Sequence, residues 1–139
     1  MPYVVEASFG ADRATLAVLC EAYDVEKLED GTEREVMRFN NALAPIKAAV
    51  FPLIKKSHSE KAREIYKELS KKYRVMYDET GSIGKRYRRQ DSIGTPFCIT
   101  VDEDTLTNNT VTVRERDSMK QEVVSLQELN AYLENKLNN

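Results

Sequence analysis

Residues 46–77, IKAAVFPLIKKSHSEKAREIYKELSKKYRVMY, decide the fold of this 139-residue chain. The run 46–51 is apolar and has the length of a strand. In 62–73, apolar side chains recur at steps of three and four residues, which is typical of an amphipathic helix. Residues 74–77 again have the composition of a strand. A strand, a helix and a strand with short connections predict a right-handed crossover and a parallel pair of strands.

The start of this helix is predicted from Ser57 and Glu60, which have the spacing of a capping box. Further along, residues 85–92 predict a short basic helix that ends at Gly94. A second capping-box pattern, Ser125 with Glu128, predicts the start of a last helix. One side of that helix carries four leucines: Leu126, Leu129, Leu133 and Leu137.

Three more strands and one loop complete the pattern. The strands are predicted at 97–101, 110–114 and 121–124, and 102–109 is predicted to be a polar loop. The order after residue 44 is therefore β-α-β-α-β-β-β-α. This order predicts an α/β fold with a five-stranded mixed β-sheet and about three helices.

The first 42 residues predict a smaller unit. Residues 3–9 have the pattern of a short strand, and Asp12 is positioned to cap the helix that follows. Leu16, Leu19 and Tyr23 share one face of that helix and are predicted core residues. Residues 24–42 are acidic and irregular, which is typical of a linker, with a further strand at 34–39 as an option.

Charge is distributed unevenly although the net charge is only −2. Residues 21–35 hold seven acidic and two basic side chains, whereas residues 55–74 hold eight basic and three acidic ones. A basic middle beside an acidic flank is suited to a polyanion, but solvated helix faces explain the same pattern. No run approaches the length of about 20 apolar residues that spans a bilayer, and the first residues lack the order of a signal peptide.

Few residues favour metal or covalent chemistry. Cys20 and Cys98 lie far apart in apolar runs and are predicted to be buried free thiols. His58 is the only histidine and is predicted to be exposed, so the sequence predicts no metal site. Gly81 and Gly84 lack the surrounding pattern of a phosphate-binding loop, which argues against a free-standing nucleotide-binding enzyme.

Two stretches resemble glycyl-tRNA synthetases, a family of class II aminoacyl-tRNA synthetases. EASFGADR at 6–13, followed by LCEAY at 19–23, is similar to motif 3 of that class. LAPIK at 43–47 and the long run from 77 to 98, YDETGSIGKRYRRQDSIGTPFC, resemble the anticodon-binding domain of the same enzymes. The family usually has proline where this chain has Ala7, and valine where it has Ala11.

The resemblance implies a division at residues 42 and 43. Residues 1–42 would be a strand-helix remnant of the catalytic domain plus an acidic linker, and 43–139 a class IIa anticodon-binding domain. The full enzyme attaches glycine to its tRNA with ATP and Mg²⁺, as a homodimer in the cytoplasm. Motifs 1 and 2 have no counterpart here, so we expect a C-terminal fragment that is inactive alone, has no catalytic residues and needs no cofactor. Its expected partner is the glycine tRNA, with no role for DNA or a membrane.

The resemblance also assigns site residues. Glu6 and Ser8 match positions that hold the ammonium group of glycine, Arg13 matches the arginine that lies against ATP, and Gly10 would permit close approach of a ligand. The tRNA-binding candidates are the four basic residues of one helix: Lys85, Arg86, Arg88 and Arg89.

Other interpretations of this basic helix remain open. Arg86 or Arg89 could pair internally with Asp91 or Asp78, and Tyr87 has the spacing of a core residue. The basic face at 55–74 and the loop at 102–109 are further candidates for RNA contact. An alternative function is a non-catalytic interaction module with the same fold, like the accessory subunit of the mitochondrial DNA polymerase. The retained motif 3 residues favour the ligase.

Overall fold

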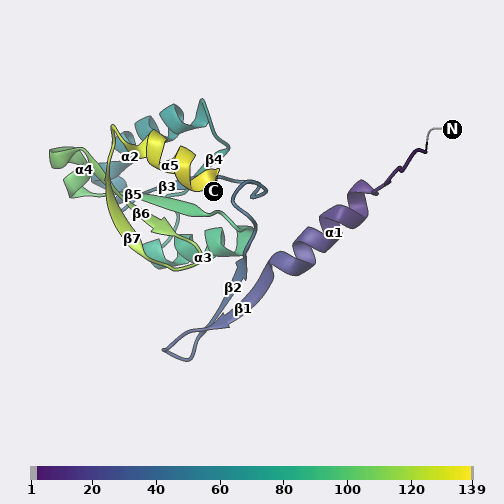
Figure 1. The fold of residues 1–139 in the computed structure, drawn as a ribbon. Helices are drawn as coiled ribbons and strands as arrows, with labels where there is room; N and C mark the ends of the chain where they lie inside the picture. The colour runs from purple at the N-terminus through teal and green to yellow at the C-terminus, as the bar shows by residue number, and fades with distance from the viewer. Residues whose placement is uncertain (1–2, 139) are drawn as a thin grey trace.

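A computed structural model of the chain describes residues 3–138, and its sheet confirms the predicted architecture (Figure 1). The strands of the main sheet are β3 (Ala48–Pro52), β4 (Val75–Tyr77), β5 (Phe97–Val101), β6 (Thr110–Glu115) and β7 (Gln121–Ser125). The helices around it are α2 (Lys55–Ser70), α3 (Ile83–Ile93), α4 (Glu103–Asn108) and α5 (Leu129–Leu137). Before them come helix α1 (Ala11–Ala22) and a hairpin of β1 (Tyr23–Lys27) and β2 (Glu33–Met37).

The main sheet has the strand order β4-β3-β5-β6-β7. Strand β3 pairs in parallel with both β4 and β5, as the strand-helix-strand pattern predicts. Strands β5, β6 and β7 pair antiparallel. The chain leaves β3 in one direction through α2 to β4, and then crosses β3 through α3 to reach β5. The strand order therefore reverses between β3 and β5, which is a topological switch point.

Helices cover both faces of the sheet, because side chains alternate along each strand. On one face, Val50 and Ile99 pack with Ile65 of α2 and Leu133 of α5. On the other face, Phe51 and its neighbours pack with α3. The second cluster comprises Ala49, Phe51, Cys98, Ile83 and Tyr87. The prediction that Tyr87 is a core residue is thus confirmed, with its ring centroid 5.6 Å from that of Phe51.

The helix boundaries differ from the capping-box predictions. Helix α2 begins at Lys55. Its N-cap residue is Ile54, three positions before the predicted cap Ser57. Helix α5 begins at Leu129 after the N-cap Glu128, so the capping box at Ser125 is also wrong. The predicted polar loop 102–109 contains α4 instead.

A capping box begins helix α4. The carboxylate of Asp102 accepts a hydrogen bond from the backbone N–H of Thr105, whose hydroxyl accepts one from the N–H of Asp102. Threonine replaces the usual Glu or Gln of this motif. Ser57 and Ser125 match the usual spacing, yet the reciprocal bonds form at Asp102 and Thr105.

The N-terminal part follows only some of its predictions: the helix is present as α1, and β2 overlaps the strand suggested at 34–39. Within the described chain, residues 3–10 form no strand, because no other strand lies beside them. Helix α1 extends away from the sheet (Figure 1), and its cap residue is Gly10 instead of Asp12. Leu16, Leu19 and Tyr23 are 61%, 43% and 56% exposed, so their prediction as core residues is wrong for this chain.

Residues 24–42 also contain more structure than a linker. Strands β1 and β2 form a regular antiparallel ladder from Tyr23 and Met37 to Lys27 and Glu33. Strand β2 packs against α3 of the main unit. At this junction Gly94 ends α3 with φ of +86°, as predicted, and a Cβ there would collide with the ring of Phe39. The hairpin is therefore fitted closely to the end of α3.

Candidate nucleic-acid interface

The carboxyl ends of the parallel strands form an exposed edge with an unusual composition. The backbone N–H of Leu53, just after β3, donates to the carbonyl of Val101 at the end of β5, 2.7 Å away. Leu53 and Ile54 are 44% and 55% exposed, and Leu106 of the neighbouring α4 is 44% exposed. In open α/β sheets, ligands bind outside the carboxyl ends of the strands at the switch point. A ligand is therefore expected at this edge of the sheet.

Two lysines near this edge have unengaged side chains. Lys56 lies in the first turn of α2, and Lys85 lies in the first turn of α3. Both are exposed, and neither side chain makes a hydrogen bond or ion pair with any residue between 3 and 138. Apolar side chains beside unpaired ammonium groups can bind single-stranded RNA. The bases stack on the apolar surface, and the lysines contact the phosphates of the RNA backbone. We call Leu53, Ile54, Lys56, Lys85 and Leu106 the switch-point surface.

His58 fixes two elements of this surface, and it is buried instead of exposed as predicted. Its Nδ1 accepts a hydrogen bond from the backbone N–H of Ile54, 3.1 Å away. Its Nε2 lies 3.3 Å from a carboxylate oxygen of Glu103 in α4. Because Nδ1 is the acceptor, the neutral ring carries its proton on Nε2 and donates it to Glu103. The imidazole thus joins the start of α2 to α4.

The four predicted basic residues of α3 separate into different roles. Arg86 is buried, and its guanidinium donates to the carbonyls of Pro52 (2.6 Å) and Gly81 (2.8 Å). Arg89 donates to the carboxylate of Asp78 and to the carbonyl of Thr80, which confirms the internal pairing with Asp78. Lys85 and Arg88 are exposed, and neither side chain makes a hydrogen bond to any residue between 3 and 138.

Arg88 lies three residues after Lys85 in α3, about one turn further along the same side of the helix. It lines an open hollow between α3 and the hairpin, together with acidic residues of the hairpin. The positive charge of Arg88 contributes to lowering the pKa of Asp30, after the larger effect of hydrogen bonds from Thr32. Acidic neighbours oppose phosphate binding, so Arg88 is less suited to RNA than Lys85.

The loop 78–82, between β4 and α3, is held from two sides. Arg86 and Arg89 hold it from α3, as described above. From α2, Lys55 approaches one oxygen of Glu79 to 2.8 Å, and Ser59 donates to the other at 3.2 Å. The hydroxyl of Tyr77 also donates to Glu79, at 2.6 Å. The hydrogen bonds from Lys55 and Tyr77 lower the pKa of Glu79 to about 2.

The residues predicted to bind glycine and ATP lie elsewhere. Glu6, Ser8, Gly10 and Arg13 are all exposed, and a Cβ at Gly10 would meet no atom within 4 Å. They lie before or at the start of α1, which extends away from the sheet. The structure brings none of them together with the basic residues of α3.

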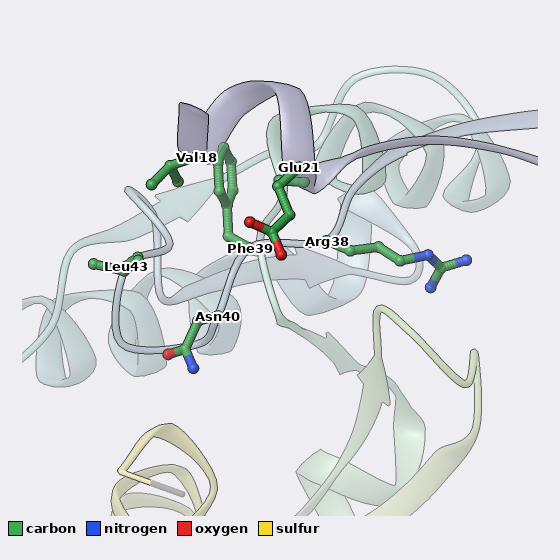
Figure 2. A pocket seen from close by; sticks show the side chains of 7 residues that line it. Val18, Glu21, Arg38, Phe39, Asn40 and Leu43 are labelled. Atoms are coloured by element: carbon green, nitrogen blue, oxygen red, sulfur yellow. The ribbon is translucent and has the colours of Figure 1, made fainter. Parts of the chain in front are cut away.

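A further hollow of about 340 Å³ lies at the base of α1, lined by side chains of α1 and of the segment after β2 (Figure 2). Phe39 stands in it beside Val18, while the guanidinium of Arg38 points away. That guanidinium is engaged by Asp24 at 2.8 Å and Glu26 at 3.0 Å. The hollow therefore offers little convergent polar chemistry.

A buried ionic cluster between the hairpin and α3 has no counterpart in the sequence predictions. Asp91 receives two hydrogen bonds from Arg114, at 2.9 and 3.1 Å, and a third at 3.3 Å from Arg34. Arg34 also donates to Glu26 and to the carbonyl of Arg116. One sequence feature could have predicted the burial of Arg34. It lies two residues before Val36 in β2, so both side chains point to the same buried side.

Two classes of feature do not occur in the described residues. Across 3–138 there is no group of three or more histidine, cysteine, aspartate or glutamate side chains that could hold a metal ion. Over the same range, no helix has the length and apolar character needed to cross a bilayer. Cys20 is exposed and Cys98 is buried, and both are free, so burial is predicted correctly only for Cys98.

Comparison with known proteins gives consistent matches. The sequence profile of a family described as "anticodon binding domain" matches residues 47–136. A glycine–tRNA ligase of Clostridium acetobutylicum is 60% identical over 137 residues, and one of Geobacillus thermodenitrificans is 58% identical over 137 residues. In both cases the match covers 99% of this chain and 29% of the relative. The chain thus spans less than a third of the length of these relatives.

A solved structure has a similar fold. The RNA binding domain of threonyl-tRNA synthetase from Cryptosporidium parvum aligns with a TM-score of 0.65 at 24% sequence identity. The alignment covers 71% of this chain and 25% of that one. At this identity the likeness concerns the fold alone.

Proposed function

This chain belongs to the anticodon binding domain family, and from that premise we propose that it grips the anticodon loop of a glycine tRNA as part of a glycine–tRNA ligase. The observation that carries the proposal is the switch-point surface. Leu53, Ile54 and Leu106 offer apolar surface at the edge where open α/β sheets bind ligands. Lys56 and Lys85 add positive charge that no carboxylate of the described chain neutralises.

This arrangement fits a single-stranded RNA loop better than a duplex. Unpaired bases can stack on apolar side chains and expose their edges for hydrogen bonds, whereas a duplex hides both. The switch-point surface contributes two lysines without an ion pair among residues 3–138, and the net charge of the chain is −2. We therefore expect moderate affinity with a shallow dependence on salt, instead of the steep dependence of a highly basic protein.

The remaining expectations concern a longer protein. We propose that Glu6 and Ser8 contact glycine, and that Gly10 and Arg13 lie against ATP, in a ligase that is a cytoplasmic homodimer using ATP with Mg²⁺. The division into 1–42 and 43–139 is proposed with it. A carboxylate and a hydroxyl suit an ammonium group, and a guanidinium suits a phosphate.

The proposal is tested by titrating the whole chain with a fluorescent glycine tRNA and with the same tRNA carrying an altered anticodon. The titrations are made at about 50 and 200 mM salt, over which range phosphate contacts lose affinity. We expect binding of both RNAs to weaken with salt, and the altered anticodon to bind at least tenfold more weakly. Binding of a protein partner without any anticodon preference would support the accessory-module alternative and overturn this proposal.

A further inference from the structure

The loop 78–82 lies at the same edge as the switch-point surface. The backbone N–H of Asp78 donates to the carbonyl of Val50 in β3, and Arg86 joins Gly81 to Pro52 at the end of β3. Thr80, Gly81 and Ser82 are exposed. Gly81 has φ of +74°, a left-handed conformation that side-chain-bearing residues rarely adopt. The shape of this loop therefore determines part of the surface that an RNA at this edge would meet.

The side of the loop facing α3 is held by two forked guanidinium groups. Arg86 donates to Gly81 through Nε and Nη2, at 3.2 and 2.8 Å, and to Pro52 through Nη1. Arg89 donates to the carboxylate of Asp78 through Nε at 3.0 Å, and to the carbonyl of Thr80 through Nη2 at 2.6 Å. A lysine could not reproduce either fork, because its ammonium group is a single point of charge. Both arginines would have to break these bonds in order to turn toward a phosphate.

The side facing α2 is held by one carboxylate. Glu79 accepts hydrogen bonds from Tyr77 and Ser59, and pairs with Lys55 and, at 3.5 Å, with Arg63. These contacts also neutralise two cations that stand near the edge. Lys55 and Arg63 are thereby occupied, whereas Lys56 next to Lys55 is not.

We propose that Glu79, Arg86 and Arg89 are positioning residues, which hold the loop 78–82 in the shape that the anticodon loop recognises, and that Lys85 supplies the phosphate-binding charge of α3. This inference rests on the function proposed above. It divides the basic residues of α3 by what their side chains already bind. It also gives Glu79, an acidic residue, a part in RNA recognition.

Salt dependence separates the two roles. Removing a phosphate contact lowers the slope of log affinity against log salt by roughly 0.7–1, whereas removing a positioning residue does not lower that slope. The test uses the whole chain and five variants: Lys85→Gln, Arg89→Lys, Arg89→Gln, Glu79→Gln and, as control, Lys120→Gln. Lys120 is exposed in the turn between β6 and β7, away from the carboxyl ends of the parallel strands. Each is titrated with a glycine anticodon stem-loop and an anticodon-altered one over a salt series.

Lys85→Gln is expected to lower the salt slope and to reduce the affinity for both RNAs by about the same factor. Arg89→Lys is expected to keep the slope, and Glu79→Gln, which releases Lys55 and Arg63 from their carboxylate, is expected not to lower it. Both variants are expected to lose about tenfold in discrimination between the two RNAs. Hydrogen exchange at the amides of 80–82 should accelerate in these two variants without RNA, and stay unchanged in Lys85→Gln. Lys120→Gln is expected to match the wild type throughout.

The inference is overturned if Arg89→Lys binds both RNAs like the wild type while Arg89→Gln lowers the slope, because Arg89 would then act as a phosphate-binding charge. It is also overturned if exchange in the loop accelerates while discrimination is unchanged. A wild-type chain that binds neither RNA contradicts the proposed function itself, which is a separate result.

Discussion

The guanidinium of Arg34 lies 3.3 Å from the carboxylate of Asp91, although 57 positions separate them, and neither side chain has any exposed surface. Asp91 belongs to α3 and Arg34 to the β1–β2 hairpin, so this ion pair joins the hairpin to the main unit. Arg114 completes the charge balance through two further bonds to Asp91. The profile match begins only at residue 47, yet the hairpin at 23–37 is tied into the same buried cluster.

Asp91→Asn is expected to destabilise the fold by about 3–5 kcal/mol, because it leaves Arg114 buried without a carboxylate and Arg34 with Glu26 alone. Arg34→Met is expected to cost less, since Asp91 keeps Arg114. Urea unfolding followed by circular dichroism measures both. Glu60→Gln, an exposed change on α2, serves as control and should stay within about 0.5 kcal/mol of the wild type. Equal effects of all three variants would contradict the account of this cluster.

Gly94→Ala is expected to destabilise the chain by about 2 kcal/mol or more. The left-handed φ of +86° costs an L side chain about 1–2 kcal/mol, and the new Cβ would collide with Phe39. Gly84→Ala is the matched control in the same helix, where a Cβ meets open space. It should stabilise by about 0.5–1 kcal/mol, since alanine favours a helix over glycine. Thermal unfolding compares the two, and equal shifts would refute the close fit at Gly94.

The ion pairs of Glu79 predict a pH dependence. Its pKa is lowered from an ordinary value of 4.5 to about 2, so its contribution to stability is complete above about pH 4.5 and is lost as the pH falls toward 2. The difference in unfolding free energy between wild type and Glu79→Gln should therefore narrow between about pH 6 and pH 3. A difference that stays constant over this range would show that the carboxylate is not held in its charged form.

The two thiols are expected to react at very different rates. Cys20 is exposed on α1, whereas Cys98 is buried and its burial raises the pKa of its thiol. Because the thiolate is the reactive form, a thiol reagent should label Cys20 in the native chain and Cys98 only on unfolding. Mass spectrometry of labelled peptides gives the rates. Prompt labelling of Cys98 in the native state would mean that β5 is accessible.

The periodic parts of the fold could be predicted from sequence, and the polar exceptions could not. The strand-helix-strand pattern around Val50 and Ile65 is set by apolar spacing, which the sequence displays directly. Arg34 and His58 can be buried because residues distant in sequence, Asp91 and Glu103, form hydrogen bonds with them. No local sequence pattern predicts these contacts. The two capping-box predictions failed because α2 already begins at Lys55, before Ser57, and because the N-cap of α5 is Glu128, three residues after Ser125.

The sequence indicated which type of residue binds RNA, but it did not indicate where on the fold the binding surface lies. The basic run 85–89 was identified, but sequence alone could not show that Arg86 and Arg89 are occupied by carbonyls and carboxylates. Leu53 and Ile54 follow the predicted strand 46–51 and were not among the predicted site residues. They lie at the switch point only because the order β4-β3-β5 brings the ends of β3 and β5 together.

The central claim is that RNA meets the carboxyl edge of the parallel strands. The most direct measurement is a map of backbone amide chemical shifts in the isotope-labelled chain as an unlabelled glycine anticodon stem-loop is added. The account predicts that the perturbed amides gather at 53–56, 78–85 and 102–106. Perturbations confined to the hairpin at 23–37, or to the far end of α2 near residue 70, would contradict it.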